Sequence, residues 1–230
     1  MSIPTDISLH FVEQGRGKPL ILLHGNGEDG SYFKHQINCF SANYRVIAID
    51  TRGHGQSPRG EKPFTIVQFA EDLHDFMDES GIEKAILLGF SDGGNIALTF
   101  ALKYPERVER MIVDGANLFP RGVKPLYQWP IEIGYHIAKL FAKKSEKAKQ
   151  NAEMLGLMVN EPHIDPADLV RLTMPVLVVA GTKDMIKEKH TRLIYKSLPN
   201  ARLSIIKGDH FVANKNADAF NKEVFVFLRN

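Results

Sequence analysis

Short apolar runs alternate with helical patterns along most of this 230-residue chain, and this alternation constrains the fold more than any other feature. Seven runs have the length and composition of strands: ISLHFV (7–12), PLILLHG (19–25), YRVIAID (44–50), KAILLGF (84–90), RVERMIVDG (107–115), PVLVVAG (175–181) and RLSIIKG (202–208). Apolar residues recur at helical spacing in three other stretches, 67–77, 96–101 and 220–228. Strands that alternate with helices predict an α/β fold, in which helices cover both faces of a mostly parallel, doubly wound sheet.

The alternation stops over residues 117–173, where five prolines interrupt helical pieces at 127–142 and 144–158. This stretch is too long for an ordinary connection and too short for an independent core. We therefore expect a small helical cap, residues 117–173, inserted into one core domain that consists of residues 1–116 and 174–230. The cap should lie over the sheet edge at which the flanking strands end.

Charge and composition narrow the class of partner. Hydrophobic residues make up 43% of the chain and charged residues 24%, as is usual in soluble globular proteins. The net charge of +2 gives no global field that would attract nucleic acid or a membrane, so we expect a small-molecule partner. The densest basic run, KKSEKAKQ at 143–150, carries both signs and is interpreted as a solvated helix face.

Cysteine content and the first residues bear on the compartment. Cys39 is the single cysteine, so no intramolecular disulfide or cysteine metal cluster can form. The N-terminus has neither a basic leader nor the apolar stretch of a signal peptide, and no apolar run reaches the length of a spanning helix. These features predict a cytoplasmic protein.

The segment GFSDG places Ser91 between Gly89 and Gly93, after the apolar run AILL and before the helical stretch NIALTFALKYP. A G-x-S-x-G sequence between a strand and a helix is typical of a nucleophile elbow, in which the serine has a strained backbone and its hydroxyl lies above the sheet. The glycines lack Cβ atoms that would collide in such a sharp turn. The same glycines would also suit an ordinary strand–helix turn with an idle serine.

A serine hydroxyl needs a base, and the base needs a third group to orient it. Two later strand ends can supply them: PVLVVAGTKD carries Asp184, and RLSIIKGDHF carries His210. Both follow the carboxyl ends of strands, where ligands bind in open α/β sheets. The predicted catalytic residues are therefore Ser91, Asp184 and His210.

The chain resembles the α/β-hydrolase fold family over nearly its whole length. Five motifs in family order carry the resemblance: LLHGNG (22–27), DTRGHGQS (50–57), GFSDGG (89–94), GTKD (181–184) and GDHF (208–211). The resemblance implies an oxyanion hole formed by the main-chain N–H groups of Asn26 and Asp92. GFSDGG together with DGAN also looks like the valacyclovir-hydrolase-like branch, whose members cleave esters of amino acids.

Other residues compete for these roles. Asp114 also ends a strand, and some members of the family carry the acid there, whereas Asp209 adjoins His210 too closely to reach its Nδ1 easily. His24 and His54 lie in two of the motifs and are expected to support loops. The carboxylate of Asp92 would favour cationic substrates beside the nucleophile, or would simply suit a helix start.

Apolar residues of the cap can form a roof over the site. Phe119 and Trp129 are the candidate substrate-binding residues, in a wider set that includes Tyr127, Tyr135, Phe141, Met154 and Met158, although such spacing also suits simple packing.

The expected activity is that of a serine hydrolase acting on small carboxylic esters, with water completing the reaction. No cofactor or metal is expected, because no H-E-x-x-H motif is present and a serine nucleophile requires neither a cofactor nor a metal. The alternatives are a C–C bond hydrolase or perhydrolase with the same triad, and a non-catalytic small-molecule receptor on the same fold. Relatives with an aspartate nucleophile are disfavoured by the serine at position 91.

Overall fold

The apolar runs form one central sheet in the computed structural model, which describes residues 6–229. The seven strands lie in the order β1-β3-β2-β4-β5-β6-β7. They are β1 (Phe11–Gln14), β2 (Pro19–Leu23), β3 (Arg45–Ile49), β4 (Ala85–Phe90), β5 (Val108–Asp114), β6 (Val176–Gly181) and β7 (Ala201–Ile206). Only β1 is antiparallel to its neighbour; the other pairs are parallel, so the predicted α/β fold with a mostly parallel sheet is confirmed.

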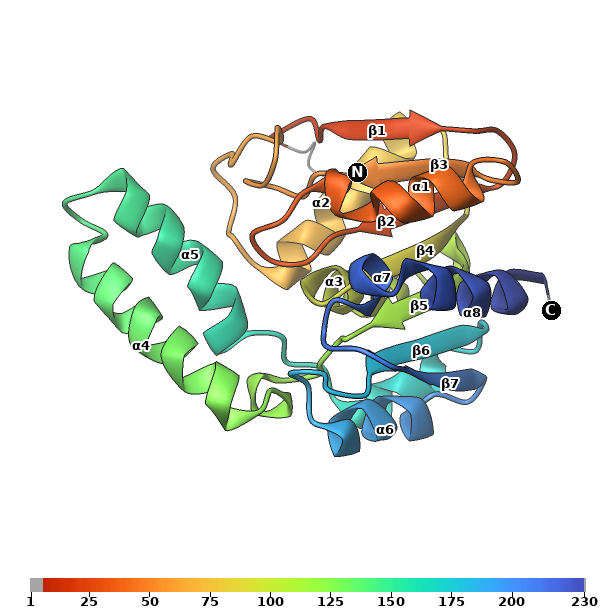
Figure 1. Cartoon of the computed structure of the whole chain (residues 1–230). Helices are drawn as coiled ribbons and strands as arrows, with labels where there is room; N and C mark the ends of the chain where they lie inside the picture. Colours follow the sequence, from red (N-terminus) through yellow and green to blue (C-terminus); the bar gives the residue numbers. More distant parts are fainter. Residues whose placement is uncertain (1–5, 230) are drawn as a thin grey trace.

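Helices cover both faces of this sheet (Figure 1). One apolar layer contains side chains of α2 (Ile66–Glu79), α3 (Asp92–Lys103) and α6 (Glu188–Ser197). The other contains side chains of α1 (Lys34–Phe40), α7 (Val212–Lys215) and α8 (Ala217–Arg229). Along β2, Ile21 and Leu23 pack in the first layer and Leu20 and Leu22 in the second, as the two-residue period of a strand requires. Short 3-10 turns complete the connections: η1 (Gly30–Phe33), η2 (Pro105–Arg107), η3 (Pro120–Gly122) and η4 (Pro166–Arg171).

The first strand departs from its predicted position at 7–12. The main-chain N–H of His10 donates to the Ser57 hydroxyl, and its carbonyl accepts from Asp50, so ladder pairing begins only at Phe11 opposite Ile49. All four residues of β1 are exposed because β1 is the edge strand. A run of apolar residues therefore could not mark its bounds.

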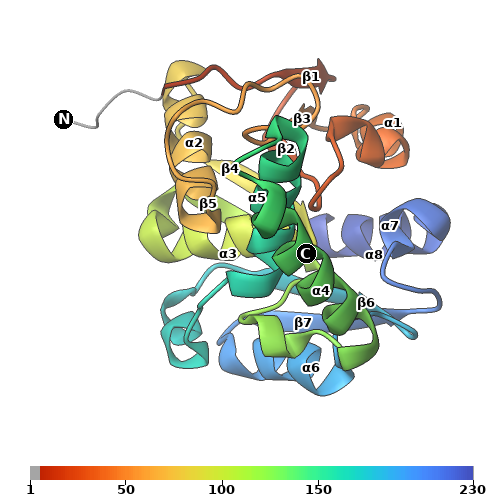
Figure 2. The same ribbon diagram turned by 90° about the vertical axis from the view of Figure 1, so that its left-hand side faces the viewer.

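Two helices connect β5 to β6 and form a hairpin: α4 (Pro125–Phe141) and α5 (Glu146–Asn160). Figure 2 shows this hairpin in front of the sheet. Pro125 occupies the first turn of α4, which starts two residues before the predicted stretch, and the Ser145 hydroxyl caps α5 by accepting the N–H of Ala148. Both helices lie in the segment 117–173, whose status as a cap separate from the core stays a prediction.

Helix α6 has no counterpart among the predicted helices. Its buried face contains His190 and Thr191 beside Ile194, so polar residues break the apolar periodicity. The ring of His190 accepts the N–H of Leu118 at 2.9 Å, which attaches the start of the inserted segment to α6. Burial, with the nearby Lys187 ammonium, lowers the pKa of His190 to about 4, so the ring is a neutral acceptor at pH 7.

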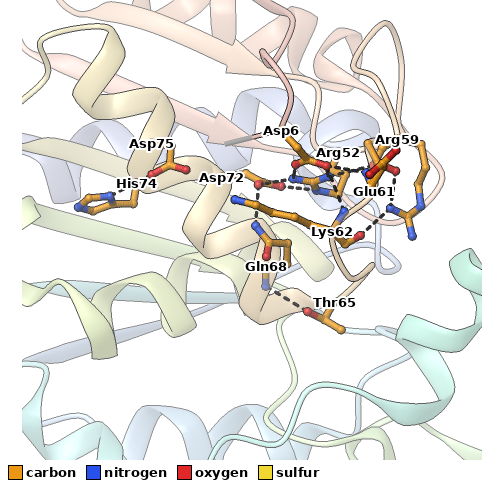
Figure 3. A network of polar contacts seen from close by, with 11 residues as sticks. Asp6, Arg52, Arg59, Glu61, Lys62, Thr65, Gln68, Asp72, His74 and Asp75 are labelled. Atoms are coloured by element: carbon orange, nitrogen blue, oxygen red, sulfur yellow. Dashed lines mark hydrogen bonds and ion pairs between the residues drawn. The ribbon is translucent and has the colours of Figure 1, made fainter. Parts of the chain in front are cut away.

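A buried ion-pair network fixes the loop that follows β3 (Figure 3). The Arg52 side chain is 0% exposed and donates to both carboxylate oxygens of Asp72 on α2, at 2.7 and 2.6 Å. It also donates to Asp6 at 2.6 and 3.1 Å. The network thus joins the first described residues, the loop and α2. Across residues 6–229, no helix is long and apolar enough to cross a membrane.

Substitution Asp72→Ala should lower the free energy of unfolding by about 1.5–3 kcal/mol, because the buried Arg52 loses one of its two carboxylate partners and keeps only Asp6. Urea denaturation followed by circular dichroism measures this change. The control is Asp75→Ala on the same helix, whose carboxylate lies 3.6 Å from His74 and should cost less than about 1 kcal/mol. Equal losses for the two variants would contradict a dominant role for the Arg52 pair.

Candidate active site

Ser91 lies at the sharp turn between β4 and α3, with φ 52° and ψ −119°. Among the described residues it is the only non-glycine residue with positive φ, a conformation that costs of order 1–3 kcal/mol. A Cβ on Gly89 would lie 2.2 Å from the carbonyl oxygen of Gly93, and one on Gly93 would lie 1.9 Å from that of Leu23. Both positions therefore require glycine, and the surrounding backbone holds the serine in its strained conformation.

The structure brings Ser91, His210 and Asp184 together. His210 Nε2 lies 3.0 Å from Ser91 Oγ, and Nδ1–H donates to Asp184 Oδ1 at 2.7 Å. Asp184 follows β6 and His210 follows β7, so parallel neighbours deliver both side chains to one edge of the sheet. A Cβ on Gly115 would lie 2.6 Å from His210 Cε1, so the end of β5 leaves just enough space for the ring.

The Asp184 carboxylate is ionised in this setting. Burial alone would raise its pKa, but hydrogen bonds from His210, Ile186 and Gly181 outweigh burial and hold the pKa below its ordinary value. The N–H of Ile186 donates to Oδ1 at 2.8 Å and that of Gly181 to Oδ2 at 3.2 Å. Asp184 can therefore orient His210 and stabilise a positive charge on its ring.

Neither rival carboxylate pairs with His210. Asp114 is fully buried, and neither of its carboxylate oxygens has a hydrogen-bond partner within the described residues. Burial, with the Asp184 charge, raises its pKa well above the ordinary value and so favours the neutral form of Asp114. Asp209 instead accepts the N–H of Phe211 at 2.9 Å and pairs with Lys215 at 2.5 Å.

His24 and His54 support loops, as the sequence predicts. The Nδ1–H of His24 donates to the carbonyl of Gly25 at 2.7 Å, and its Nε2 accepts the N–H of Thr51 at 3.0 Å. His54 contacts the Thr51 hydroxyl at 3.1 Å, and burial with the neighbouring His24 lowers the pKa of His54 to about 4. These contacts connect the loop after β2 to the loop after β3.

Asn26 and Asp92 flank Ser91 from two elements. Asn26 follows β2, and Asp92 is the first residue of α3. Among residues 6–229, neither main-chain N–H donates to a protein acceptor. Two N–H groups that are free to donate are the chemical requirement of an oxyanion hole. The Asn26 side chain has a separate contact, because its amide donates to the carbonyl of Met154 on α5 at 2.7 Å.

The Asp92 carboxyl group is buried beside Ser91. Its Oδ1 accepts from the Asn95 amide at 3.1 Å, and its Oδ2 has no hydrogen-bond partner in the described part of the chain. Burial raises the pKa of Asp92 to about 6, while the nearby amides of Asn26 and Asn95 lower it and the charge of Glu161 raises it. Asp92 can therefore change its charge near neutral pH.

A small cavity of about 10 Å³ lies against Ser91, enough for roughly one water molecule. The lining comprises Ser91, Asp92, Asn117, Val123, Met158, Glu161, Met185 and Ile186. Of these, Met158 belongs to the predicted apolar set and Asn117 to the DGAN motif. Glu161 and Met185 were missed. The path of residues 117–173 brings Glu161 near Ser91, whereas Met185 directly follows Asp184 in the chain, a position that could have identified it. An ester larger than water requires the lining side chains to move.

The structure does not bring the two candidate substrate-binding residues to this cavity. The Phe119 ring packs against the core and contacts His190, with ring centroids 4.6 Å apart. Trp129 is 66% exposed on α4. The sequence-based expectation treated the apolar residues of 117–173 as one roof over the site, whereas α5 supplies Met158 to the cavity and the side chain of Trp129 on α4 is exposed.

In the described residues, no group of three histidine, cysteine, aspartate or glutamate side chains could hold a metal ion.

Comparison with known proteins gives concordant results. A family model described as the alpha/beta hydrolase fold matches residues 18–132. The serine hydrolase BPHL of Homo sapiens is 30% identical over 97% of this chain and 84% of its own length.

Solved structures share the fold over almost the whole chain. The enol-lactonase from Burkholderia xenovorans LB400 has a TM-score of 0.82 at 22% identity and covers 97% of both chains. A meta-cleavage product hydrolase from Pseudomonas fluorescens IP01, a mutant complexed with acetates, has a TM-score of 0.78 at 25% identity, covering 97% of this chain and 94% of its own. At 22% identity, the likeness to the enol-lactonase supports the fold alone. The likeness to the meta-cleavage product hydrolase, at 25% identity, agrees with the family match.

Proposed function

Because this chain belongs to the α/β-hydrolase fold family and is a hydrolase, we propose that it cleaves small carboxylic esters through an acyl-enzyme on Ser91. The observation that carries the proposal is the hydrogen-bonded series Ser91–His210–Asp184 at a strained serine. The similarity to a serine hydrolase over nearly the whole chain supports it.

In the first half-reaction, His210 Nε2 takes the Ser91 hydroxyl proton while Oγ attacks the ester carbonyl carbon. The carbonyl oxygen becomes an oxyanion, which accepts hydrogen bonds from the N–H groups of Asn26 and Asp92. His210 then gives its proton to the departing alcohol oxygen, and the acyl group stays on Ser91. Asp184 stays ionised throughout and orients the ring.

In the second half-reaction, a water molecule replaces the alcohol. It gives a proton to His210 and attacks the acyl carbon, and the oxyanion again accepts hydrogen bonds from the same N–H groups. Collapse of this intermediate releases the carboxylic acid and returns the proton to Ser91 Oγ. The reaction needs no redox partner, and one water is consumed for each ester cleaved.

Substitution Ser91→Ala should abolish ester hydrolysis and leave the fold intact, because the neighbouring glycines fix the turn and alanine keeps only a Cβ there. The loss should be many orders of magnitude, since triad members act as a unit. Hydrolysis of a panel of chromogenic esters measures it, with circular dichroism as the control for folding. Activity within about tenfold of wild type would remove Ser91 from the mechanism.

Parallel dienoate and peroxide assays separate the C–C hydrolase and perhydrolase alternatives, and no turnover of any substrate would favour a receptor.

Asp184→Asn should reduce kcat by about 10⁴, because an amide favours the wrong imidazole tautomer. The matched control is Asp114→Asn, which replaces a neutral buried acid by an amide of the same shape and should have a small effect. Steady-state kinetics on one ester measures both variants. A larger loss for Asp114→Asn would reverse the assignment of the acid and leave the serine mechanism in place.

We further propose that Asp92 selects substrates that carry an ammonium group near the scissile ester. Its buried Oδ2 has no protein partner in the described chain, and Asp92 lines the cavity beside Ser91. Glu161, a second carboxylate, lines the same cavity and uses Oε2 to accept the N–H of Ile66 at 2.6 Å. Two carboxylates beside the nucleophile favour a cation and disfavour an anion.

Asp92→Asn should lower kcat/KM for α-ammonium esters by roughly ten- to a hundredfold relative to neutral esters of the same size, as expected for a hydrogen bond between charged groups. In the wild type, the ratio of the two kcat/KM values should fall as pH drops through about 6, because Asp92 is then protonated. The ratio cancels the dependence on the base that both esters share. In Asp92→Asn the fall in this ratio should be smaller, because Glu161 is then the cavity carboxylate that remains to titrate. Equal losses for both esters would leave Asp92 as a helix-start residue.

A further inference from the structure

Helix α4 exposes a continuous row of large apolar side chains. Seven of the fourteen exposed large apolar residues in the described chain belong to this single helix. Six of them recur at spacings that place them on one side of a helix, and we name them the α4 stripe: Leu126, Trp129, Ile133, Ile137, Leu140 and Phe141. At about 1.5 Å per residue the stripe is about 22 Å long. Isolated exposed apolar residues are normal, but a row of this length marks an interaction surface.

The α4 stripe points away from the rest of the protein. The opposite side of α4 packs on α5, where Gly134 faces Leu155 and Gly156 faces Tyr135. In turn, α5 contacts the core loops on its other side, through the hydrogen bond from Asn26 to Met154 and the ion pair of Glu153 with Arg59 at 2.7 Å. Helix α5 therefore lies between α4 and the core loops, and Figure 1 shows α4 as the outer helix of the hairpin.

Positive charge is concentrated where the stripe ends. Five exposed lysines lie at the free end of the hairpin, and we name them the basic tip: Lys139, Lys143, Lys144, Lys147 and Lys149. Glu146 is the one acidic residue among positions 139–150. Its contact with Lys149 at 3.5 Å is between exposed groups and neutralises little. The net charge of +2, which predicts no membrane partner, does not reveal this local excess. The interpretation of 143–150 as a solvated face rests on the presence of both signs in that run.

We propose that the α4 stripe and the basic tip form a docking surface for an anionic lipid membrane, on which the hairpin lies in the interface without crossing the bilayer. An apolar helix face that includes a tryptophan, with lysines beside it, is the pattern of an interfacial amphipathic helix. The stripe enters the boundary between headgroups and acyl chains, and the lysines contact anionic headgroups. The inference is independent of the proposed esterase activity, since none of these residues lines the Ser91 cavity.

A second copy of the chain is the other possible occupant of an apolar helix face. Lysine is depleted in protein–protein interfaces, and the centres of such interfaces avoid charge. Here lysines continue directly from the stripe at Lys143 and Lys144. An anionic surface accommodates the apolar row and the positive end together, and therefore fits both observations.

The chain contains one tryptophan, and it lies in the stripe, so Trp129 reports directly on docking. The full-length protein is titrated with phosphatidylcholine vesicles that contain or lack about one third phosphatidylserine. With anionic vesicles we expect a blue shift of the Trp129 emission, quenching by brominated acyl chains, and co-sedimentation. The binding should be weaker with pure phosphatidylcholine and should decline as salt is raised.

Two variants with matched controls isolate the two parts of the surface. Ile133→Ser/Ile137→Ser should weaken vesicle partitioning at least about tenfold, whereas Val67→Ser/Val170→Ser, at similarly exposed positions elsewhere, should not. Lys143→Ser/Lys144→Ser should weaken it roughly ten- to thirtyfold, whereas Lys189→Ser/Lys222→Ser should not. Circular dichroism verifies that each variant is folded, which is expected because all eight side chains are exposed.

Three results would overturn the proposal. One is an unchanged Trp129 emission at saturating anionic vesicles. Another is equal partitioning of the stripe variant and its control. The third combines two observations: the wild type is a dimer in sedimentation velocity and Ile133→Ser/Ile137→Ser is a monomer, and neither protein binds vesicles. That result would assign the stripe to contact with a second copy of the chain.

Discussion

The candidate site depends on one backbone conformation, the positive φ of Ser91. That conformation is tolerated because Gly89 and Gly93 let the main chains of β4, α3 and β2 approach to distances at which a Cβ would collide. The close approach fixes the hydroxyl at the carboxyl edge of the sheet and frees the N–H of Asp92 at the start of α3. The proposed nucleophile and one proposed oxyanion donor thus follow from the same strained turn, and the rest of the candidate site is arranged around it.

Two carboxylates at neighbouring strand ends illustrate how environment decides a role. Asp114 ends β5 and Asp184 follows β6, and both are buried. Asp184 receives an imidazole and two main-chain N–H groups, which keep it ionised, whereas Asp114 receives none within the described residues and is neutral. A second ionised carboxylate hydrogen-bonded to His210 would compete for its proton; burial favours the neutral form of Asp114, and Asp184 is the carboxylate that accepts from His210 Nδ1.

Sequence patterns predict the elements whose apolar residues reveal a strand or helix period, and they fail where an element is fully exposed or where its buried face is polar. The strands β2 to β7 and the helices α2, α3 and α8 carry enough apolar residues to reveal their period. The residues of the edge strand β1 are all exposed, and the buried face of α6 contains the polar residues His190 and Thr191. The order and strand-end positions of Ser91, Asp184 and His210 predicted the residues that the structure brings together. The cavity wall could not be predicted in full, because Glu161 reaches Ser91 only through the path of residues 117–173, although Met185 adjoins Asp184 in the chain.

The two helices of the hairpin differ in chemistry: α5 faces the Ser91 cavity, and α4 exposes apolar side chains. Its inner helix, α5, supplies Met158 to the Ser91 cavity and its Met154 carbonyl to the amide of Asn26, the residue that is proposed to donate to the oxyanion. Its outer helix, α4, exposes the apolar stripe. Helices α4 and α5 pack closely at Gly134 and Gly156, where a side chain of the partner helix lies against each glycine. Because the helices are in close contact there, a shift of α4 would displace α5. A contact on the outer face therefore has a short physical route to the loop that carries Asn26, through two helices and one hydrogen bond.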